Sequence, residues 1–587
     1  MTQKKDFIRG MDVSSYLEMI DKGYKYYDYQ GNQVDLLAFA KEQGFNYVRL
    51  RIWNNPSRIK ESGGYCDLEK TIQMARLIKQ QGYGFFLDFH YSDWWADPGH
   101  QQKPEAWENL SYDELKEAVY KYTKHVLTEL KKENLTPDLV QIGNEIRTGM
   151  LFPDGAVNNW TGLAGLINSG IRGVREVLDR KDTQVVIHLD QGGHYDYFEE
   201  WFDAAMEHGV EDFDIIALSY YPFWHGTFFD FKNNLEGLAK RYGKKLLIAE
   251  TAHAYQQSSD DFFTEDQERA AGFAATPENQ RKVLELIQNI IGNVSGNMGM
   301  GFFYWEPFMR MEKNAGGWGN CMALVDEEGK AGEGLKAIAY DNFEADRNKI
   351  VKMYAPQEPI KVKPEGESLD EICPETLEAF RQEGILPAAL DALQMDGNVR
   401  KISVEWTESD ESTPEKIVLI GTSAECTECT KISVISQKDT EVEQNLLPNG
   451  NFRDDLKEWK IQIKSGAEWL RYEIESTEAN NEKSLSFFSK SEYKIEAATK
   501  ADVLEEGSYK LHCKYMGDNT TGVEGKLFAR IQGVEYSSNI FPRDNVWQTY
   551  EIDEIKAPLE GSVEVGVWIK APAGYGKIKD VCLVKNK

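Results

Sequence analysis

The strongest constraint on the fold is a regular alternation between Phe7 and about Asn342, where short apolar runs are followed by polar loops and amphipathic segments. The amphipathic segments repeat their apolar residues at the spacing of a buried helix face. The apolar runs have the length and the bounding polar residues of buried strands. We expect eight strands, which are Phe7–Ser14, Asn46–Trp53, Gly82–Tyr91, Asp138–Glu145, Gln184–Asp190, Asp214–Tyr221, Lys244–Thr251 and Met298–Pro307.

Strict alternation of strand and helix favours right-handed crossovers between parallel strands. Eight repeats over this length therefore predict an α/β fold, a closed (β/α)8 TIM barrel. An open doubly wound sheet is the alternative. That fold would want a glycine-rich phosphate turn after its first strand, and the stretch MDVSSYLEM offers none.

The residue composition of the chain changes after the barrel segment. Residues 354–367, YAPQEPIKVKPEGE, mix prolines with charges and are typical of a linker. Further on, Val399–Trp406, Lys416–Thr422 and Thr430–Ser436 alternate apolar and polar residues at period two. This part loosely resembles the immunoglobulin-like bacterial repeats, and we expect a small Ig-like β-module here.

Many short alternating strands follow Gln444, among them Ser508–Tyr515 and Gly561–Lys570, which predicts a jelly-roll β-sandwich. Its opening, NLLPNGNF, and the later Trp459 resemble the start of carbohydrate-binding modules of the galactose-binding-like fold. We predict three domains: a barrel over 1–352, a linker and Ig-like module over 353–443, and a carbohydrate-binding-like sandwich over 444–587.

The charge of the chain limits its partners. A formal net charge of -30 argues against nucleic acid, because nothing concentrates Lys and Arg to neutralise phosphates. A neutral partner fits better, and we expect a monomer. No apolar run is long enough for a membrane span and no signal peptide is visible, so the protein stays inside the cell unless a leader has been removed.

The cysteines do not indicate a disulfide framework, since the seven residues are scattered and odd in number. Cys426 and Cys429 form a single C-x-x-C pair, without the second pair or the histidines that would complete a zinc site. An incidental or locally oxidised pair is the interpretation that we prefer.

Two glutamates close two of the predicted strands: Glu145 ends DLVQIGNE, and Glu250 ends KKLLIAET. The carboxyl ends of barrel strands supply catalytic groups. Double-displacement glycoside hydrolysis needs such a pair, one as acid/base and one as nucleophile, with the carboxyl groups about 5–5.5 Å apart. We predict that Glu145, kept protonated by a partly desolvated site, is the proton donor, and that the adjacent Asn144 donates a hydrogen bond to a sugar 2-hydroxyl.

Other polar and aromatic residues collect at the same strand ends. Arg49 and Arg51 share parity, so both can face the barrel interior, where a buried guanidinium needs a carboxylate partner. We weigh a structural ion pair against a role for Arg51 in holding Glu250 ionised. A tyrosine near the seventh strand could orient the nucleophile, and parity leaves open which one. Glu306 is a third candidate carboxylate, ranked below the other two because Trp305 should take the inward position.

We expect the substrate to contact a set of residues at these strand ends, with indole rings to stack on pyranose faces and Trp305 as the floor of the sugar site. These residues are Arg51, His90, Asp93, Trp94, Trp95, Asn144, His188, Asp190, Tyr220, Trp305, Trp318 and Asn320.

Metal and phosphate chemistry at the barrel mouth is not indicated. An amidohydrolase barrel carries a His-x-His motif on its first strand, but the first predicted strand of this chain has Met11, Asp12 and Val13 at these positions. A phosphate-binding barrel would want glycine-rich loops after its last two strands. Here the first of these loops is bulky and acidic, and the glycines of the second lie among aromatic residues.

Several motifs, in order, resemble family 53 endo-β-1,4-galactanases: GMDVSS, RLRIWNNP, DFHYSDWWADP, PDLVQIGNE, HLDQGG, LLIAET and FYWEP. The resemblance covers the barrel segment. It implies retaining endo-hydrolysis of β-1,4-galactosidic linkages in the (arabino)galactan side chains of pectin, giving galacto-oligosaccharides, with Glu145 as acid/base and Glu250 as nucleophile.

Some members of that family bind calcium in the long loop after the seventh strand. This chain has Asp260 and Asp261 there but lacks the usual Asp/His/Asn arrangement, so we expect no metal and no required cofactor. Two rival functions remain to be separated by experiment: another β-glycanase such as a mannanase or xylanase, and a polysaccharide-binding protein whose barrel has lost activity.

Overall fold

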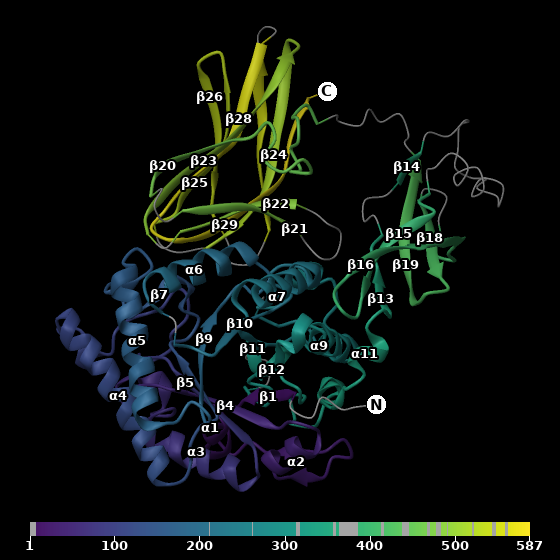
Figure 1. The fold of residues 1–587 in the computed structure, drawn as a ribbon. Helices are drawn as coiled ribbons and strands as arrows, with labels where there is room; N and C mark the ends of the chain where they lie inside the picture. Colours follow the sequence, from purple (N-terminus) through teal and green to yellow (C-terminus); the bar gives the residue numbers. More distant parts are fainter. Residues whose placement is uncertain are drawn as a thin grey trace. The chain divides into compact units, whose positions relative to one another are not determined.

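The computed structural model describes residues 7–210, 212–260, 262–312, 317–355, 360–362, 386–412, 416–436, 445–466, 470–476, 483–489, 491–518, 522–542, 547–557 and 561–586. The chain divides into two compact units. One comprises Met1–Ile350 with Leu393–Val399, and the other comprises Val351–Ala392 with Arg400–Lys587. Figure 1 shows the fold, and each unit is described by itself.

The first unit is built on a closed barrel of eight parallel strands in the order β1-β12-β11-β10-β9-β6-β5-β4. Each strand lies within one of the eight predicted ranges, so the predicted barrel is confirmed. The strands are β1 (Ile8–Asp12), β4 (Tyr47–Ile52), β5 (Gly84–Phe89), β6 (Leu139–Ile142), β9 (Gln184–Leu189), β10 (Ile215–Ser219), β11 (Lys245–Thr251) and β12 (Gly299–Trp305).

Helices surround the barrel strands (Figure 1). The long helix α4 begins with a capping box formed by Ser111 and Glu114, and it buries Leu115, Val126 and Leu130. The helices are α1 (Tyr16–Asp21), α2 (Leu36–Glu42), α3 (Leu68–Gln80), α4 (Tyr112–Lys132), α5 (Trp160–Val177), α6 (Tyr195–Glu207), α7 (Phe228–Tyr242), α8 (Glu265–Ala271), α9 (Pro277–Gly292), α10 (Trp318–Cys321) and α11 (Phe343–Asp346). Two short hairpins lie in the loops: β2 (Tyr26–Tyr27) with β3 (Gln33–Val34), and β7 (Gly149–Met150) with β8 (Gly155–Ala156).

Inside the barrel, an apolar layer of side chains is followed by a polar layer nearer the carboxyl ends of the strands. The apolar layer consists of Ile8, Phe86, Leu139, Val186, Ile215, Ala217, Leu247, Ala249 and Phe303. Because side chains alternate along a strand, the next inward positions on β5, β6, β9 and β10 are those of Asp88, Gln141, His188 and Ser219. The apolar layer closes the barrel beneath these buried polar groups, which lie at the carboxyl ends of the strands.

Strand β11 departs from strict alternation near its carboxyl end. Leu218 of β10 pairs with Ile248, but the next residue, Ser219, pairs with Glu250. Ala249 is thus an extra residue, a β-bulge, and bulges re-aim side chains next to active sites. Consequently both Ala249 and Glu250 face the barrel interior.

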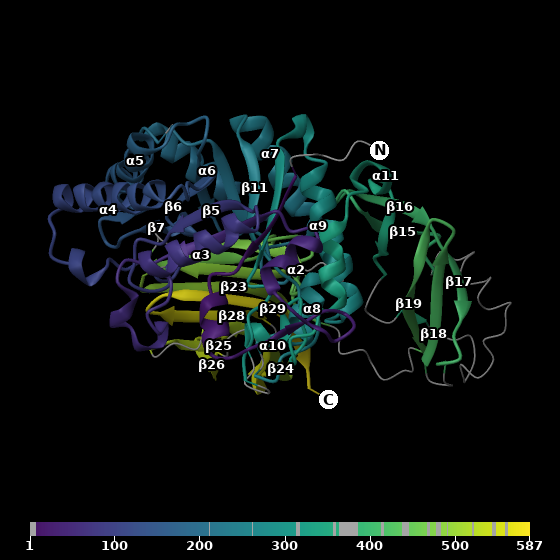
Figure 2. The same ribbon diagram turned by 90° about the horizontal axis from the view of Figure 1, so that it is seen from below.

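Two small sheets follow the barrel in the chain. One has the order β13 (Ile350–Met353), β15 (Ala389–Gln394), β16 (Val399–Ser403). The other has the order β14 (Ile360–Val362), β19 (Cys426–Ser436), β18 (Lys416–Ser423), β17 (Glu405–Glu408), and the last three strands lie side by side in Figure 2. The run predicted as one strand, Val399–Trp406, is divided between β16 and β17. Most of the predicted linker lies outside the described residues.

The C-x-x-C pair lies at the start of β19. Cys426 and Cys429 are not joined in a disulfide. Residues three apart in a strand point to opposite faces, so the two thiols do not converge on one site.

The C-terminal part forms two five-stranded antiparallel sheets around one core, which confirms the predicted β-sandwich. Its core includes Phe487, Tyr515, Leu527 and Val567 from the two sheets. The first sheet has the order β20 (Lys460–Ser465), β23 (Tyr493–Leu504), β28 (Gly561–Ala571), β25 (Glu524–Ile531), β26 (Val534–Ile540). The second has the order β21 (Arg471–Ser476), β22 (Lys483–Ser489), β29 (Gly574–Lys585), β24 (Gly507–Gly517), β27 (Gln548–Ala557).

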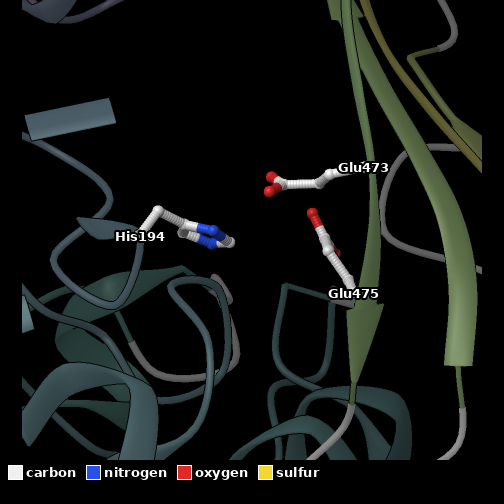
Figure 3. A group of neighbouring side chains, drawn as sticks. All are labelled: His194, Glu473 and Glu475. Carbon is white, nitrogen blue, oxygen red and sulfur yellow. The ribbon is translucent and has the colours of Figure 1, made fainter. Parts of the chain in front are cut away.

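Glu473 and Glu475 project from the same face of β21 (Figure 3). Lys577 of β29 forms an ion pair with Glu475. His194, the third residue drawn in Figure 3, belongs to the barrel unit and stacks on Tyr197 with ring centroids 5.2 Å apart.

The predicted domain boundaries at 352 and 443 stay predictions. Residues 393–399, which those boundaries place in the Ig-like module, belong to the compact unit of the barrel. Among the described residues, no helix is long and apolar enough to cross a membrane.

Candidate active site

A buried arginine at the carboxyl end of β4 connects the surrounding strands. Arg49 is 1% exposed, and its Nη1 donates to Asp12 Oδ2 at 3.0 Å and to Glu250 Oε1 at 2.9 Å. Its Nη2 donates to Asp88 Oδ2 and to Asn144 Oδ1, both at 2.9 Å. One guanidinium therefore fixes side chains from β1, β11, β5 and the end of β6, as a buried charge requires.

Glu250 is held by donors on both carboxylate oxygens. Arg49 occupies Oε1, and the Tyr221 hydroxyl donates to Oε2 at 3.0 Å. Burial raises the pKa of Glu250, and the Arg49 guanidinium opposes that shift. Both donors favour the carboxylate form, which is the form that a nucleophile needs.

Glu145 lies just after β6 in a different environment. Its backbone has φ of 48°, in the left-handed region that few non-glycine residues adopt. Its Oε1 lies 2.6 Å from Ser219 Oγ, and no other hydrogen bond to its side chain occurs within the described residues. Burial raises the pKa of Glu145 well above its usual range, and the charges of Glu250 and Asp190 add to the shift. A carboxyl group of this kind is suited to donate a proton at neutral pH.

The structure brings the two glutamates into one site. Ser219 contacts Glu145, and its own strand pairs it with Glu250. The charge of Glu250 also raises the pKa of Glu145 directly. The separation of about 5–5.5 Å that retention requires stays a prediction.

Asn144 and His188 connect the arginine to the proton donor. Asn144 Nδ2 donates to the Ala96 carbonyl at 2.8 Å, while its Oδ1 faces His188 Nδ1 at 3.1 Å. His188 Nε2 lies 2.9 Å from Ser219 Oγ. Burial lowers the pKa of His188 well below its usual range, and the Arg49 charge adds to the effect.

Arg51 faces the barrel interior as its parity predicts, and it forms a structural ion pair, one of the two roles weighed for it. Its Nη1 pairs with Glu306 Oε1 at 2.6 Å, and its guanidinium lies 4.2 Å from the centroid of the Trp95 ring. The other role weighed for Arg51, holding Glu250 ionised, falls to Arg49, which contacts Glu250. Because Arg49 and Arg51 are two positions apart on one strand, the sequence predicts that both face inward. It does not tell how far along the barrel axis each side chain lies, and so which carboxylate each can reach.

Glu306, the third candidate carboxylate, is 1% exposed and serves this ion pair. Its Oε1 also accepts from the Ser15 backbone N–H at 3.1 Å. Burial raises the pKa of Glu306 to about 7. These contacts fit its lower rank as a catalytic candidate.

His90 and Asp93 are occupied in shaping the loop after β5. His90 Nε2 lies 3.0 Å from Asp88 Oδ2, and its Nδ1 accepts from the Ala96 backbone N–H at 3.0 Å. Asp93 accepts from the backbone N–H groups of Asn55 at 2.9 Å and Glu105 at 3.0 Å. Both ring nitrogens of His90 thus have protein partners, and the two side chains position the neighbouring indoles.

A continuous row of rings, here called the aromatic belt, runs along the strand ends. Consecutive ring centroids are 5.9, 5.9, 4.5, 5.5 and 5.6 Å apart. Its members, in order, are Trp94, Trp95, Trp305, Trp318, Tyr221 and Trp224. Every ring except that of Tyr221 is partly exposed, so the belt offers apolar faces beside the two glutamates.

Beside the belt opens a pocket of about 460 Å³. Its lining combines indole faces with charged and polar side chains, a common composition for a ligand site. The lining includes Trp94, Trp95, Asp97, His100, Gln102 and Lys103.

Tyr220 does not face this site. It is fully buried, its ring stacks on Phe231 with centroids 3.9 Å apart, and its hydroxyl donates to the Gly226 carbonyl at 3.1 Å. Tyr220, predicted as a substrate contact, therefore lies away from the glutamates, and the neighbouring tyrosine that contacts Glu250 is Tyr221. Tyr221 has the same parity as the inward-facing Ser219, which is the signal that could have identified it.

Two further predicted contacts are held by protein groups. Asp190 receives two hydrogen bonds from Arg147, at 2.8 and 2.9 Å. Asn320 Nδ2 donates to the Glu312 carbonyl at 3.1 Å, whereas the neighbouring Trp318 donates from Nε1 to the Trp305 carbonyl at 3.2 Å.

Sequence reasoning missed the central role of Arg49 and the presence of Ser219 and Gln141. Gln141 donates to Asp88 Oδ1 at 2.6 Å and lies within the same buried network. Leu139 and Ala217 face the barrel interior, and Gln141 and Ser219 follow them by two positions on the same strands. Because side chains two positions apart point to the same face, the sequence could have identified Gln141 and Ser219 as inward-facing.

A parallel barrel with two glutamates and an aromatic belt at its carboxyl end defines the class of protein, a glycoside hydrolase. The family model described as glycosyl hydrolase family 53 matches residues 8–338. The chain belongs to this family.

Individual relatives agree with the family. The chain is 33% identical to "Endo-beta-1,4-galactanase" of Bacillus subtilis over 361 residues, covering 58% of this chain and 82% of that protein. It is 35% identical to "Probable arabinogalactan endo-beta-1,4-galactanase A" of Aspergillus terreus over 327 residues, covering 54% of this chain and 90% of that protein.

Solved structures match the same part of the chain. The catalytic domain of the family 53 protein of Ignisphaera aggregans is 41% identical, with a TM-score of 0.54, covering 57% of this chain and 96% of that one. A fungal β-1,4-galactanase is 31% identical, with a TM-score of 0.52, covering 57% of this chain and 99% of that one.

Proposed function

We propose that this protein is a retaining endo-β-1,4-galactanase that cleaves the (arabino)galactan side chains of pectin and releases galacto-oligosaccharides. Membership of family 53 and the galactanase names of its relatives support this function. The observation that carries it is the contrast between the two glutamates. Arg49 and Tyr221 hold Glu250 by hydrogen bonds that favour its ionised form, while burial and nearby negative charge favour a protonated Glu145.

In the first step a galactan strand lies along the aromatic belt. The Glu250 carboxylate attacks the anomeric carbon as the bond from that carbon to the glycosidic oxygen breaks. Glu145 gives its proton to the departing oxygen. The products of this step are a shortened chain and a galactosyl ester of Glu250.

In the second step Glu145, now a carboxylate, takes a proton from a water molecule. The water oxygen bonds to the anomeric carbon, and the ester bond to Glu250 breaks. Two displacements at the same carbon return the β-configuration. Both glutamates then have their starting protonation.

We propose supporting roles for the remaining site residues. Asn144 uses one N–H of its Nδ2 for the Ala96 carbonyl, which leaves the second for a sugar 2-hydroxyl. Trp305 and the other exposed rings of the belt stack on pyranose faces. Arg51, His90, Asp93, Asp190 and Asn320 hold the loops in which these contacts lie.

We propose that catalysis needs no metal. Asp261 lies outside the described residues, and the Asp260 carboxylate accepts from the Phe262 N–H at 3.3 Å. In the described residues of the loop after β11, no three His, Cys, Asp or Glu donors come together. No step is assigned to calcium, and unchanged turnover after treatment with a chelator is the expected result.

The substrate class is tested with a panel of purified neutral polysaccharides. We expect new reducing ends from linear β-1,4-galactan and none from β-1,4-mannan or β-1,4-xylan. NMR of the first product formed should show the β-anomer, as retention requires. Cleavage of xylan or mannan in preference to galactan would reject the proposal.

Replacement of the nucleophile tests the assignment of Glu250. We expect Glu250→Ala to lose at least about 10³-fold in kcat on galactan, because no other group can form the covalent intermediate. Glu312→Ala, which removes an exposed carboxylate, is the control and should keep wild-type turnover. Near-normal turnover by Glu250→Ala would overturn the assignment.

We also propose that the protein is a monomer that acts on galactan without nucleic acid or membrane partners. The net charge of -30 supports this, since it disfavours binding to phosphate backbones and anionic lipid. Light scattering coupled to gel filtration should give a single mass near 67.0 kDa.

A further inference from the structure

The hydroxyl of Ser219 has two polar neighbours but only one hydrogen. Its Oγ lies 2.6 Å from Glu145 Oε1 and 2.9 Å from His188 Nε2. Ser219 and His188 are both fully buried. Since a serine hydroxyl donates only one hydrogen bond, one of the two contacts must be made with a hydrogen from the neighbour.

The far end of this chain of contacts is fixed by Asn144. Its Nδ2 donates to the Ala96 carbonyl, which can only accept, and its Oδ1 accepts from the Arg49 guanidinium, which can only donate. The amide orientation is therefore determined. His188 Nδ1, 3.1 Å from Asn144 Oδ1, must carry a hydrogen and donate it to that oxygen.

The other ring nitrogen of His188 is then an acceptor. Burial lowers the pKa of His188, and the charge of the Arg49 guanidinium acts in the same direction, so the imidazole is neutral. A neutral imidazole with hydrogen on Nδ1 has a lone pair on Nε2. Ser219 must give its hydrogen to this lone pair, and the hydrogen between Ser219 and Glu145 must come from Glu145.

We propose that His188, acting through Ser219, keeps Glu145 in its protonated form in the resting enzyme. His188 is then a positioning residue for the proton donor, because it reaches the reaction only through the serine hydroxyl. This inference deepens the proposed function and rests on the assignment of Glu145 as the acid/base.

The chain of contacts has a consequence during turnover. When Glu145 has given its proton to the leaving oxygen, Ser219 can donate to the new carboxylate or to His188, but not to both. One buried acceptor then lacks its hydrogen bond, which makes the ionised state less favourable. The balance is restored when Glu145 takes a proton from the attacking water, since Ser219 again donates to His188.

Other charges also face Glu145. Glu250 on β11, Asp190 after β9 and Asp97 in the loop after β5 favour the protonated form, and the cationic neighbour is Arg147, paired with Asp190. These groups are the same in every variant below. Differences between variants therefore report the contribution of His188 and Ser219.

The first test is a double-mutant cycle on the pH profile of kcat/KM for linear galactan. The basic limb reports loss of the Glu145 proton. We expect His188→Phe to lower the pKa of this limb by about one pH unit, because the freed Ser219 hydroxyl can donate to the carboxylate. In the Ser219→Ala background, His188→Phe should not shift the limb further, since no hydroxyl remains to be freed.

Ser169→Ala is the matched control. Ser169 is also a buried serine, but it donates only to the Gly165 carbonyl at 2.8 Å within α5, and its removal should leave the limb in place. An equal shift by His188→Phe in both backgrounds, or no shift in either, would overturn the inference.

The second test does not depend on a variant that folds. Neutron diffraction from deuterium-exchanged crystals of the wild-type enzyme should place deuterium on Glu145 Oε1 and His188 Nδ1, and none on His188 Nε2. Deuterium on Nε2, in either a neutral or a charged ring, would reject the inference.

The role of His188 and the proposed function can be rejected separately. If galactan is cleaved and Glu145→Gln is inactive on it, but Nε2 of His188 carries the deuterium, only the inference fails. If the wild-type enzyme does not cleave galactan, or Glu145→Gln is as active as wild type, the proposed function itself fails.

Discussion

At the scale of single residues, the two tyrosines after β10 offer a clear test of the site. The Tyr221 hydroxyl donates to Glu250, whereas the Tyr220 hydroxyl donates to a backbone carbonyl away from the glutamates. A hydrogen bond to a charged group contributes about 1.5–3 kcal/mol. Tyr221→Phe should therefore raise the pKa of Glu250 by about one pH unit or more.

The direction of the change in activity follows from the role of Glu250. Attack requires its ionised form, so a higher pKa moves the acidic limb of kcat/KM to higher pH, and activity is lost first at low pH. Tyr220→Phe is the matched control, and its acidic limb should coincide with that of the wild type. An unchanged limb in Tyr221→Phe would mean that the hydroxyl does not act on the nucleophile.

The sequence could identify the glutamates but not all of their partners. Glu145 and Glu250 were predictable because each ends an apolar run, and strand ends meet at one rim of a barrel. Parity with Ser219 could have placed Tyr221 on the inner face, but parity gives neither the height of a side chain nor its partner, so the contacts of Tyr221 and Arg49 with Glu250 could not be predicted. Those depend on neighbouring strands, whose register cannot be read from one segment.

At the scale of elements, all eight barrel strands were predictable because period and length distinguish strand from helix in an alternating chain. The bulge in β11 was not. Strict alternation from Leu247 would place Ala249 inward and Glu250 outward, yet both face the interior. A bulge arises from pairing with β10 and leaves no mark in the sequence of β11 alone.

Closure of the barrel between β1 and β12 depends on a glycine. Gly301 has φ of 143°, and a Cβ at this position would collide with the backbone carbonyl of Ile8 on β1. Gly301→Ala should therefore lower the free energy of unfolding by at least about 2 kcal/mol, since backbone in a neighbouring strand cannot move as a flexible side chain can.

The control for Gly301→Ala separates collision from backbone conformation. Gly209 also has a positive φ, 84°, but a Cβ there would meet nothing within 4 Å. Gly209→Ala should cost only the conformational strain, about 1–2 kcal/mol. The measurement is the urea midpoint at which galactan hydrolysis is lost, and equal midpoints in the two variants would contradict the collision.

At the scale of the whole molecule, the net charge of -30 predicts how the rate responds to salt. A neutral galactan feels no long-range force from the protein, so kcat/KM should change by less than about twofold between about 0.05 and 0.5 M NaCl. A polysaccharide that carries galacturonate is repelled at low salt, and its cleavage should accelerate as salt is added. A strong salt dependence on neutral galactan would indicate a charged ligand instead.

The C-terminal sandwich presents an indole, that of Trp568, which suits the carbohydrate-binding role proposed for this module. Trp568 lies on the outer face of β28, partly exposed, with the ammonium groups of Lys494 and Lys526 at 5.5 and 5.9 Å from its ring. An aromatic ring on a sheet face can stack on a sugar while neighbouring lysines donate to hydroxyls. We therefore expect Trp568→Ala to weaken retention of the full-length protein on insoluble galactan.

The effect of Trp568→Ala should be confined to binding, since the two glutamates lie in the barrel. Hydrolysis of a short soluble galacto-oligosaccharide should proceed at the wild-type rate, whereas hydrolysis of insoluble galactan should slow in proportion to the lost adsorption. Phe541→Ala removes another exposed aromatic side chain of the sandwich, 71% exposed, and serves as the control that keeps wild-type adsorption. Equal adsorption by the Trp568 and Phe541 variants would exclude this face as the binding surface.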